Sequence, residues 1–245
     1  PNIQYHPEKN PDGKFKAAQL VRSCRALRDM CLAYGIPLLS GKDSMYVDGN
    51  LTGRYGVSHK VSAPETIQFS AISLVPDIAC CPTMDIKAPG DLVYLLGTTR
   101  DELGGSEYYD HLGYVGCQVP QVHPEDFLPL YRALQRAIAD ALTASVRGVY
   151  RGGLAVHAAL AAMGGGLGLA LDLDKLPVDK SLREDKLLFS ESAGRFLVTV
   201  APDQRQAFEA VMQDHACGCV GVVTEAPRLV VNGMGTTPLI DMALD

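Results

Sequence analysis

A short polar segment, Ser40 to Ser44, contains the residues best suited to chemistry: a glycine, a lysine, an aspartate and two serines. Glycine lets a ligand approach the backbone closely, and lysine balances phosphate charge. An aspartate oxygen can hold Mg²⁺, and a serine hydroxyl can donate to an anion. The mixture suits a polyphosphate site, although it lacks the G-x-x-x-x-G-K-[ST] spacing of a P-loop. A plain polar turn is the alternative.

A second candidate cluster is Gly104-Gly105-Ser106-Glu107, which follows a predicted strand. Its backbone N–H groups could cradle a phosphate, as successive amides do in anion-binding nests. The alternative is a tight turn before a short helix.

Two more clusters stand beside predicted helices or strands. Gly152 and Gly153 begin a small-residue helix, where they could receive an anion or permit close helix–sheet packing. Glu191 and Ser192 precede a strand together with Arg195, where they could bind a ligand or form a structural Glu–Arg pair.

Histidine and cysteine residues give weaker signals. His157 lies among alanines with no carboxylate nearby in sequence, which favours a packed histidine. Cys24 and Cys31 share a face of a predicted helix and are expected in its core. Cys217 and Cys219 could bind a soft metal, but no second Cys/His pair stands at zinc spacing.

Composition narrows the class of protein. The 245 residues are 47% hydrophobic and 20% charged, with a net charge of −6, which fits a globular protein and argues against nucleic acid as the main partner. No apolar run approaches the roughly 20 residues of a membrane helix, and no signal peptide is visible. Seven cysteines, an odd number, are typical of reduced thiols, so we expect a cytoplasmic protein. Because residue 1 is proline, we expect a piece of a longer chain.

Hydrophobic periodicity predicts the elements that position these clusters. Helices are expected over 14–34, 124–145, 154–163 and 202–215. Strands are expected to end at Leu38–Leu39 and to span 57–61, 66–75, 91–97, 167–173, 196–200, 218–224 and 228–232, with a turn at Asp48-Gly49. Prolines between residues 76 and 90 suggest a boundary between two lobes. The pattern predicts an α/β or α+β fold.

Five stretches together resemble the second repeat of phosphoribosylformylglycinamidine synthase, of the aminoimidazole ribonucleotide synthetase superfamily. They read NPDGKFKAAQLVRSC, SGKDSMYVDG, DLVYLLGTTRDELGGSEYY, RGGLAVHAALAAMGGGLG and LFSESAGRF. The resemblance implies an incomplete amino lobe, residues 1–84, followed by an α/β carboxyl lobe, residues 85–245.

The resemblance also implies an activity and partners. The family uses ATP, Mg²⁺ and glutamine-derived ammonia to convert formylglycinamide ribonucleotide into formylglycinamidine ribonucleotide in purine biosynthesis. Its active site lies between lobes of different repeats. This chain would therefore need a first repeat and a glutaminase domain or subunit, and would be inactive alone with no catalytic residue of its own. A second copy of the chain is another partner that would complete the missing lobe.

Family roles are carried over to the matching motif. Gly41 would contact ATP and Ser44 the substrate, while Lys42, which replaces a metal-binding asparagine, would contact phosphate, with Asp43 near the metal. Gly104, Gly105, Ser106, Glu107, Glu191 and Ser192 would be further ligand-binding residues.

One departure from the family pattern concerns the segment before the small-residue helix. The family aspartate that holds Mg²⁺ falls on Gly148, and a nucleotide-contacting serine falls on Tyr150. Since a hard cation needs oxygen ligands, we expect no metal here and an auxiliary nucleotide site that is empty or rebuilt. Two other interpretations remain: a structural repeat without catalytic function, or another superfamily member such as aminoimidazole ribonucleotide synthetase or selenophosphate synthetase.

Overall fold

The structure, a computed structural model, describes residues 12–42, 48–62 and 66–244. Contacts divide the chain into two compact units, Pro1–Leu74 (unit 1) and Val75–Asp245 (unit 2). This division falls earlier than residue 84, where the sequence predicts the lobes to meet. Among the described helices, none is long and apolar enough to cross a membrane.

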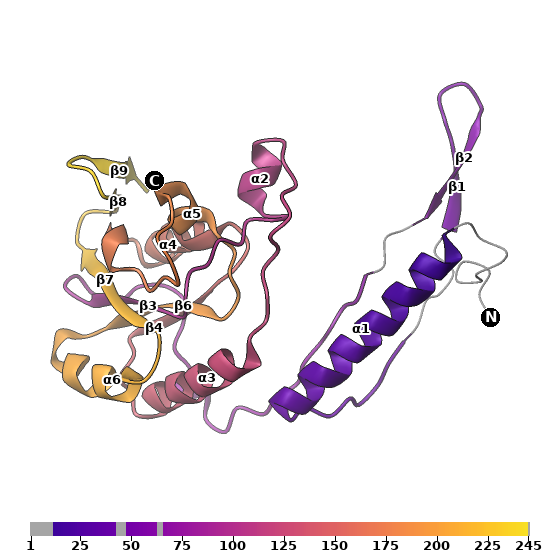
Figure 1. Cartoon of the computed structure of the whole chain (residues 1–245). Helices are drawn as coiled ribbons and strands as arrows, with labels where there is room; N and C mark the ends of the chain where they lie inside the picture. The colour runs from indigo at the N-terminus through magenta and orange to yellow at the C-terminus, as the bar shows by residue number, and fades with distance from the viewer. Residues whose placement is uncertain (1–11, 43–47, 63–65, 245) are drawn as a thin grey trace. The chain divides into compact units, whose positions relative to one another are not determined.

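Unit 1 contains one long helix and one hairpin. Helix α1, Gly13–Tyr34, ends where Gly35 adopts a left-handed conformation (φ 66°) and the Ile36 N–H donates to the Cys31 carbonyl at 3.0 Å. Strands β1, Asp48–Thr52, and β2, Ser58–Ser62, pair antiparallel (Figure 1). Their connecting turn is closed by a hydrogen bond from the Gly53 N–H to the Val57 carbonyl.

Several predictions for unit 1 are wrong. Asp48-Gly49 begins β1 instead of forming a turn, and Leu38, Leu39 and residues 66–75 have no regular structure. Leu39 is 84% exposed, so it does not end a buried strand. A strand needs a hydrogen-bonded neighbour, and within the described ranges the only sheet of this unit is the β1–β2 hairpin.

The prediction that the two cysteines of α1 lie in a core is also wrong. Cys24 is exposed and Cys31 is half-buried, so neither belongs to a core. In the described part of unit 1 the buried residues are Gly13 and Lys16, neither of which is a large apolar residue. The face that the cysteines share therefore has nothing in this part of the chain to pack against.

Unit 2 is built on a seven-stranded sheet with the order β4-β6-β3-β7-β5-β8-β9. All neighbouring strands are antiparallel except β5 and β8, which are parallel. The elements are η2 Ile78–Cys80, β3 Leu92–Leu96, α2 Glu107–His111, α3 Pro124–Ala139, β4 Ser145–Val149, α4 Gly153–Gly165, β5 Gly168–Asp172, η3 Leu173–Lys175, α5 Glu184–Phe189, β6 Arg195–Val200, η4 Pro202–Gln204, α6 Arg205–Met212, β7 Cys217–Thr224, β8 Arg228–Asn232 and β9 Pro238–Ala243.

Helices cover both faces of this sheet, as Figure 1 shows, with α4 and α5 on one face and α3 and α6 on the other. The central strand β3 alternates between two apolar clusters. Val93 and Leu95 belong to the α4 side, and Tyr94 and Leu96 belong to the α3–α6 side. A strand covered on both faces is apolar throughout, which explains the unbroken hydrophobic run in this part of the sequence.

The predicted mixed α/β fold is confirmed, with local corrections in unit 2, among them the short helix α5, which the sequence did not predict. The helix expected to reach Ser145 ends at Ala139, because the chain turns at Ala141 (φ 53°) and residues 145–149 then pair with β6 as strand β4. Strand β9, which pairs antiparallel with β8, was missed.

Candidate functional site

The polar segment of unit 1 is described only in part. Gly41 and Lys42 are exposed and have no regular structure, while Asp43 and Ser44 lie outside the described residues. A Cβ added at Gly41 would meet no atom within 4 Å. Packing against the described residues therefore gives no reason for a glycine at position 41, and its contact with ATP remains a prediction.

In unit 2, the loop of Gly104 and Gly105 is closed by its own backbone. The Gly104 N–H donates to the Gln118 carbonyl and the Gly105 N–H to the Val115 carbonyl, both at 2.7 Å. A Cβ at Gly104 would lie 2.8 Å from the backbone of Gln118, so only glycine permits this approach. The two amides proposed to cradle phosphate thus have partners inside the chain.

The next two residues connect this loop to α2 and to a distant segment. The Ser106 hydroxyl accepts from the Tyr109 N–H at 3.2 Å and caps α2, while its own N–H donates to the Leu103 carbonyl. The Glu107 N–H donates to Oε1 of Glu191 at 2.9 Å. Ser106 is buried, so its hydroxyl serves the helix cap in this structure.

Glu191 joins the two glycine clusters that the sequence suggested separately. Its Oε1 also accepts the Gly152 N–H at 2.8 Å, just before α4. The Arg151 side chain forms an ion pair with Glu107 across the same junction. The structure therefore brings Glu107, Glu191 and Gly152 together, although they lie far apart in the sequence and no local pattern links them.

Ser192 and Arg195, which follow Glu191 in the sequence, belong to a buried network of hydrogen bonds. The Ser192 hydroxyl accepts the Arg100 N–H at 3.0 Å. Arg195 is 1% exposed, and its guanidinium donates to the carbonyls of Ser192 and Ser190 and to the Thr99 hydroxyl. Burial lowers the pKa of Arg195 to about 10, and the charges of Glu102 and Glu191 oppose that shift. The direct hydrogen bonds of Arg195 thus go to Ser190, Ser192 and Thr99, and not to Glu191 as in the Glu–Arg pair that the sequence suggested.

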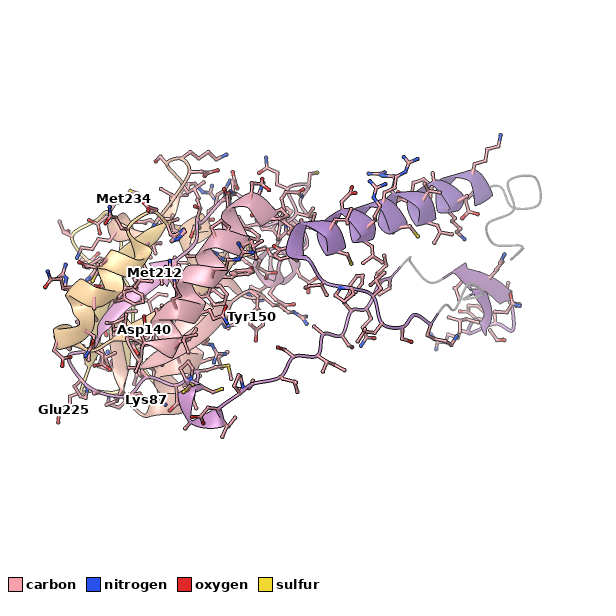
Figure 2. The ribbon with its side chains drawn as sticks, turned by 90° about the horizontal axis from the view of Figure 1, so that it is seen from below. Lys87, Asp140, Tyr150, Met212, Glu225 and Met234 are labelled. Carbon is pink, nitrogen blue, oxygen red and sulfur yellow. The ribbon has the colours of Figure 1, made fainter. Side chains whose placement is uncertain are left out.

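In the segment before α4, where the resemblance implies a metal-binding motif, a tyrosine ring packs against a histidine ring. Tyr150 is 58% exposed (Figure 2). Its ring centroid lies 4.3 Å from that of His157. His157 is buried, as expected for a packed histidine, and its Nδ1 accepts from Nε of Arg147 at 3.0 Å. Burial and the Arg147 charge lower the pKa of His157. Gly148 contributes no side-chain oxygen, so these residues do not fit Mg²⁺.

Across the described ranges, no cluster of three or more His, Cys, Asp or Glu side chains has a geometry that could hold a metal ion. Burial raises the pKa of Cys217 to about 12, which disfavours the thiolate that a soft metal would require.

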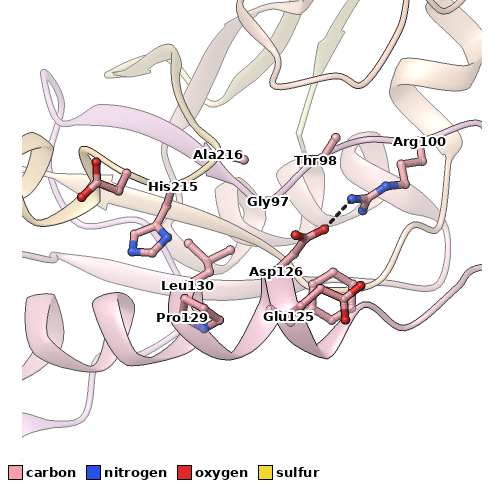
Figure 3. Close-up of a pocket in the computed structure, with 11 residues that line it drawn as sticks. Gly97, Thr98, Arg100, Glu125, Asp126, Pro129, Leu130, His215 and Ala216 are labelled. Atoms are coloured by element: carbon pink, nitrogen blue, oxygen red, sulfur yellow. Dashed lines mark hydrogen bonds and ion pairs between the residues drawn. The ribbon is translucent and has the colours of Figure 1, made fainter. Parts of the chain in front are cut away.

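Unit 2 also has a cavity of about 290 Å³ that the sequence did not predict (Figure 3). It lies between the end of β3 and the start of α3. Arg100 Nη2 lies 3.1 Å from the Asp126 carboxylate there, and Glu125 and Asp126 stand in the first turn of α3, where negative charge favours the helix terminus. Its lining residues are Gly97, Thr98, Arg100, Glu125, Asp126, Phe127, Pro129, Leu130, Asp214, His215 and Ala216.

Fold and sequence together define the class of protein. Residues 88–233 match the family described as AIR synthase related protein, C-terminal domain, and the chain belongs to this family. Among named relatives, the phosphoribosylformylglycinamidine synthase subunit PurL of Synechococcus sp. is 34% identical over 212 residues, which cover 85% of this chain and 26% of the relative. PurL of Thermococcus sibiricus is 31% identical and covers 91% of this chain and 29% of its own length. The expected resemblance is thus confirmed, although the chain spans less than a third of these two relatives.

Solved structures agree on the fold. T. maritima PurL complexed with ATP has a TM-score of 0.56 at 19% identity, covering 68% of this chain and 27% of that chain. T. maritima PurL complexed with FGAR has a TM-score of 0.65 at 16% identity, covering 88% of this chain and 35% of that chain.

Proposed function

We propose that the chain supplies part of an ATP-dependent C–N ligase that converts formylglycinamide ribonucleotide into formylglycinamidine ribonucleotide with glutamine-derived ammonia. The observation that carries this proposal is the alignment of PurL subunits with nearly the whole chain at more than 30% identity. The setting would be purine biosynthesis in the cytoplasm. Neither a membrane nor a nucleic acid is a proposed partner.

The proposed contribution of unit 1 is the polar segment. Gly41 would approach ATP, Lys42 would balance phosphate charge, and Ser44 would hold the substrate. Asp43 would stand near Mg²⁺ in the complete enzyme, where the cation would neutralise phosphate charge. Because the start of α4 does not fit Mg²⁺, no step is assigned to a metal in unit 2.

The proposed partners are a first repeat of the same synthase and a glutaminase. Exposed apolar side chains support the first of these, since Phe69, Ile72 and Leu74 are solvent-facing in a segment without a strand partner. Several exposed large apolar side chains in one short segment are typical of a site of association. A second copy of this chain is the alternative occupant, and alone the chain would have little activity.

The proposal is tested by reconstitution. The chain is mixed with a first-repeat chain and a glutaminase, and ATP-dependent amidine formation is measured. The variant Ser44→Ala is expected to lower kcat/KM at least about tenfold, since a lost substrate hydrogen bond weakens transition-state binding. Ser58→Ala, an exposed serine of β2, serves as the control and is expected to leave kcat/KM unchanged. An unchanged value for Ser44→Ala would refute the substrate role.

A structural repeat without catalytic function is the second candidate. It is favoured by Gly148 and Tyr150, which replace the metal-binding aspartate and the nucleotide-contacting serine. Calorimetry of the isolated chain with ADP and Mg²⁺ separates the possibilities for unit 2. We expect no binding in the micromolar range, and micromolar binding would contradict the loss of the auxiliary site.

A further inference from the structure

We propose that Glu191 is a built-in anion that occupies the start of α4, so that unit 2 accepts no external phosphate or carboxylate there. Its Oε1 receives two backbone N–H groups, from Glu107 at 2.9 Å and from Gly152 at 2.8 Å. Glu107 is the first residue of α2, and Gly152 directly precedes α4. This inference concerns contacts within unit 2 alone and does not depend on the proposed reaction.

The electrostatics of the position suit a carboxylate. Helix α4 has 13 residues, and its first backbone amides have no acceptor within the helix, so its N-terminus attracts negative charge. A carboxylate oxygen can accept from both N–H groups at once, whereas a neutral side chain would form weaker hydrogen bonds. Glu191 thereby supplies the charge that a bound oxyanion would supply.

The backbone around Glu191 holds the carboxylate in place. The Glu191 N–H donates to the Glu102 carbonyl at 3.1 Å. On its two sides, the hydroxyls of Ser190 and Ser192 are buried and bond to the backbone of Arg100. The backbone that carries the Glu191 side chain is therefore fixed by hydrogen bonds. This favours a carboxylate that stays at the start of α4 over one that visits it transiently.

The start of α4 packs closely against α5, which limits the space for a competing ligand. A Cβ added at Gly153 would lie 2.6 Å from the Cα of Phe189, so the helix start is pressed against the end of α5. The nearby cation, Arg151, is already paired with Glu107. Both the donors and the local positive charge are therefore used within the chain.

The test removes the carboxylate from the full 245-residue chain and offers a replacement. Thermal unfolding of Glu191→Ala is followed in sodium acetate and in sodium chloride of equal ionic strength. We expect a midpoint a few degrees below wild type in chloride, because two N–H groups lose their acceptor. Acetate should raise that midpoint saturably, since it binds the folded state. Wild type and Glu225→Ala, whose glutamate lies in an exposed turn, should show no acetate-specific shift (Figure 2).

A second measurement does not rely on the stability of the alanine variant. In NMR spectra, acetate added to Glu191→Ala should shift the amides of Glu107 and Gly152 and leave that of Val93, in β3, unchanged. In Glu191→Gln, which keeps a weaker acceptor, the same two amides should move relative to wild type. Inorganic phosphate should shift neither amide in wild type. Saturable phosphate shifts of these amides in wild type, or an alanine variant that ignores acetate, would overturn the proposal.

Discussion

Unit 1 and unit 2 use similar apolar sequence patterns with opposite results. In unit 2, both faces of the sheet are covered by helices and the apolar residues of β3 are almost fully buried. In the described part of unit 1, large apolar side chains of residues 36–39 and 66–74 are exposed. The difference shows that an apolar pattern identifies the side chains whose burial would be favourable. Whether they are buried depends on other elements that supply a surface to pack against.

The two units therefore differ in how they are expected to fold. A sheet of three or more strands with covered faces is stable by itself, whereas a two-stranded hairpin is marginal in water. Unit 2 contains such a covered sheet, with seven strands. The described part of unit 1 contains only a two-stranded hairpin. We infer that unit 1 depends on contacts beyond those within the unit.

The largest expected effect compares two phenylalanines. Phe208 is fully buried, and its ring centroid lies 4.9 Å from that of Tyr94, whereas Phe69 is 60% exposed. Phe208→Ala should lower the free energy of unfolding by about 3–5 kcal/mol, because it leaves a cavity in the core. Phe69→Ala should change it by less than about 0.5 kcal/mol. Urea denaturation of the isolated chain measures both, and equal losses would remove the contrast between the units.

A smaller effect is expected from two glycines. A Cβ at Gly221, in β7, would overlap the backbone of Ala170 in the neighbouring strand, whereas one at Gly41 meets open space. Gly221→Ala should lower the free energy of unfolding by about 1–3 kcal/mol, as overpacking does. Gly41→Ala should leave stability unchanged and weaken ATP use in the reconstituted enzyme. A destabilised Gly41→Ala would show instead that this glycine has a packing role.

The smallest effect is a pH dependence of unit 2. Burial and Arg147 lower the pKa of His157 in the folded state, so the unfolded chain binds the proton more readily. The free energy of unfolding should therefore fall as pH drops below about 6.5, by at most about 1.4 kcal/mol per pH unit. Urea titrations between pH 8 and pH 5 should give a shallower dependence for His157→Gln. Parallel curves over the whole range would mean that His157 does not titrate differently on folding.

The sequence predicted well those elements whose partners lie in the same chain. In unit 2, strands β3 and β5 to β8 and helix α4 follow from periodicity and from glycines beside them. Helix α1 was also predicted, because a helix forms its backbone hydrogen bonds within itself. The prediction for residues 66–75 was wrong because periodicity describes side chains and does not reveal whether the backbone has a neighbouring strand. Strand β4 was merged into α3 because no glycine or proline marks the turn at Ala141.

The candidate site was predicted as separate fragments. The glycine pairs and the Glu191 motif were recognisable from residue type, since glycine permits close backbone approach and a carboxylate accepts hydrogen bonds. Their meeting at the Oε1 atom of Glu191 was not recognisable, because it joins the starts of α2 and α4 through tertiary packing alone. The roles of Gly41, Lys42, Asp43 and Ser44 remain predictions that rest on the family resemblance.

Amide hydrogen exchange of the chain, alone and with a first-repeat chain of the same synthase, tests most directly whether unit 1 depends on another chain. We predict that residues 66–74 exchange rapidly in the chain alone and gain at least about tenfold protection with the partner. Strand β3 should be protected in both states. Strong protection of residues 66–74 in the chain alone, or exchange that the partner leaves unchanged, would contradict this account.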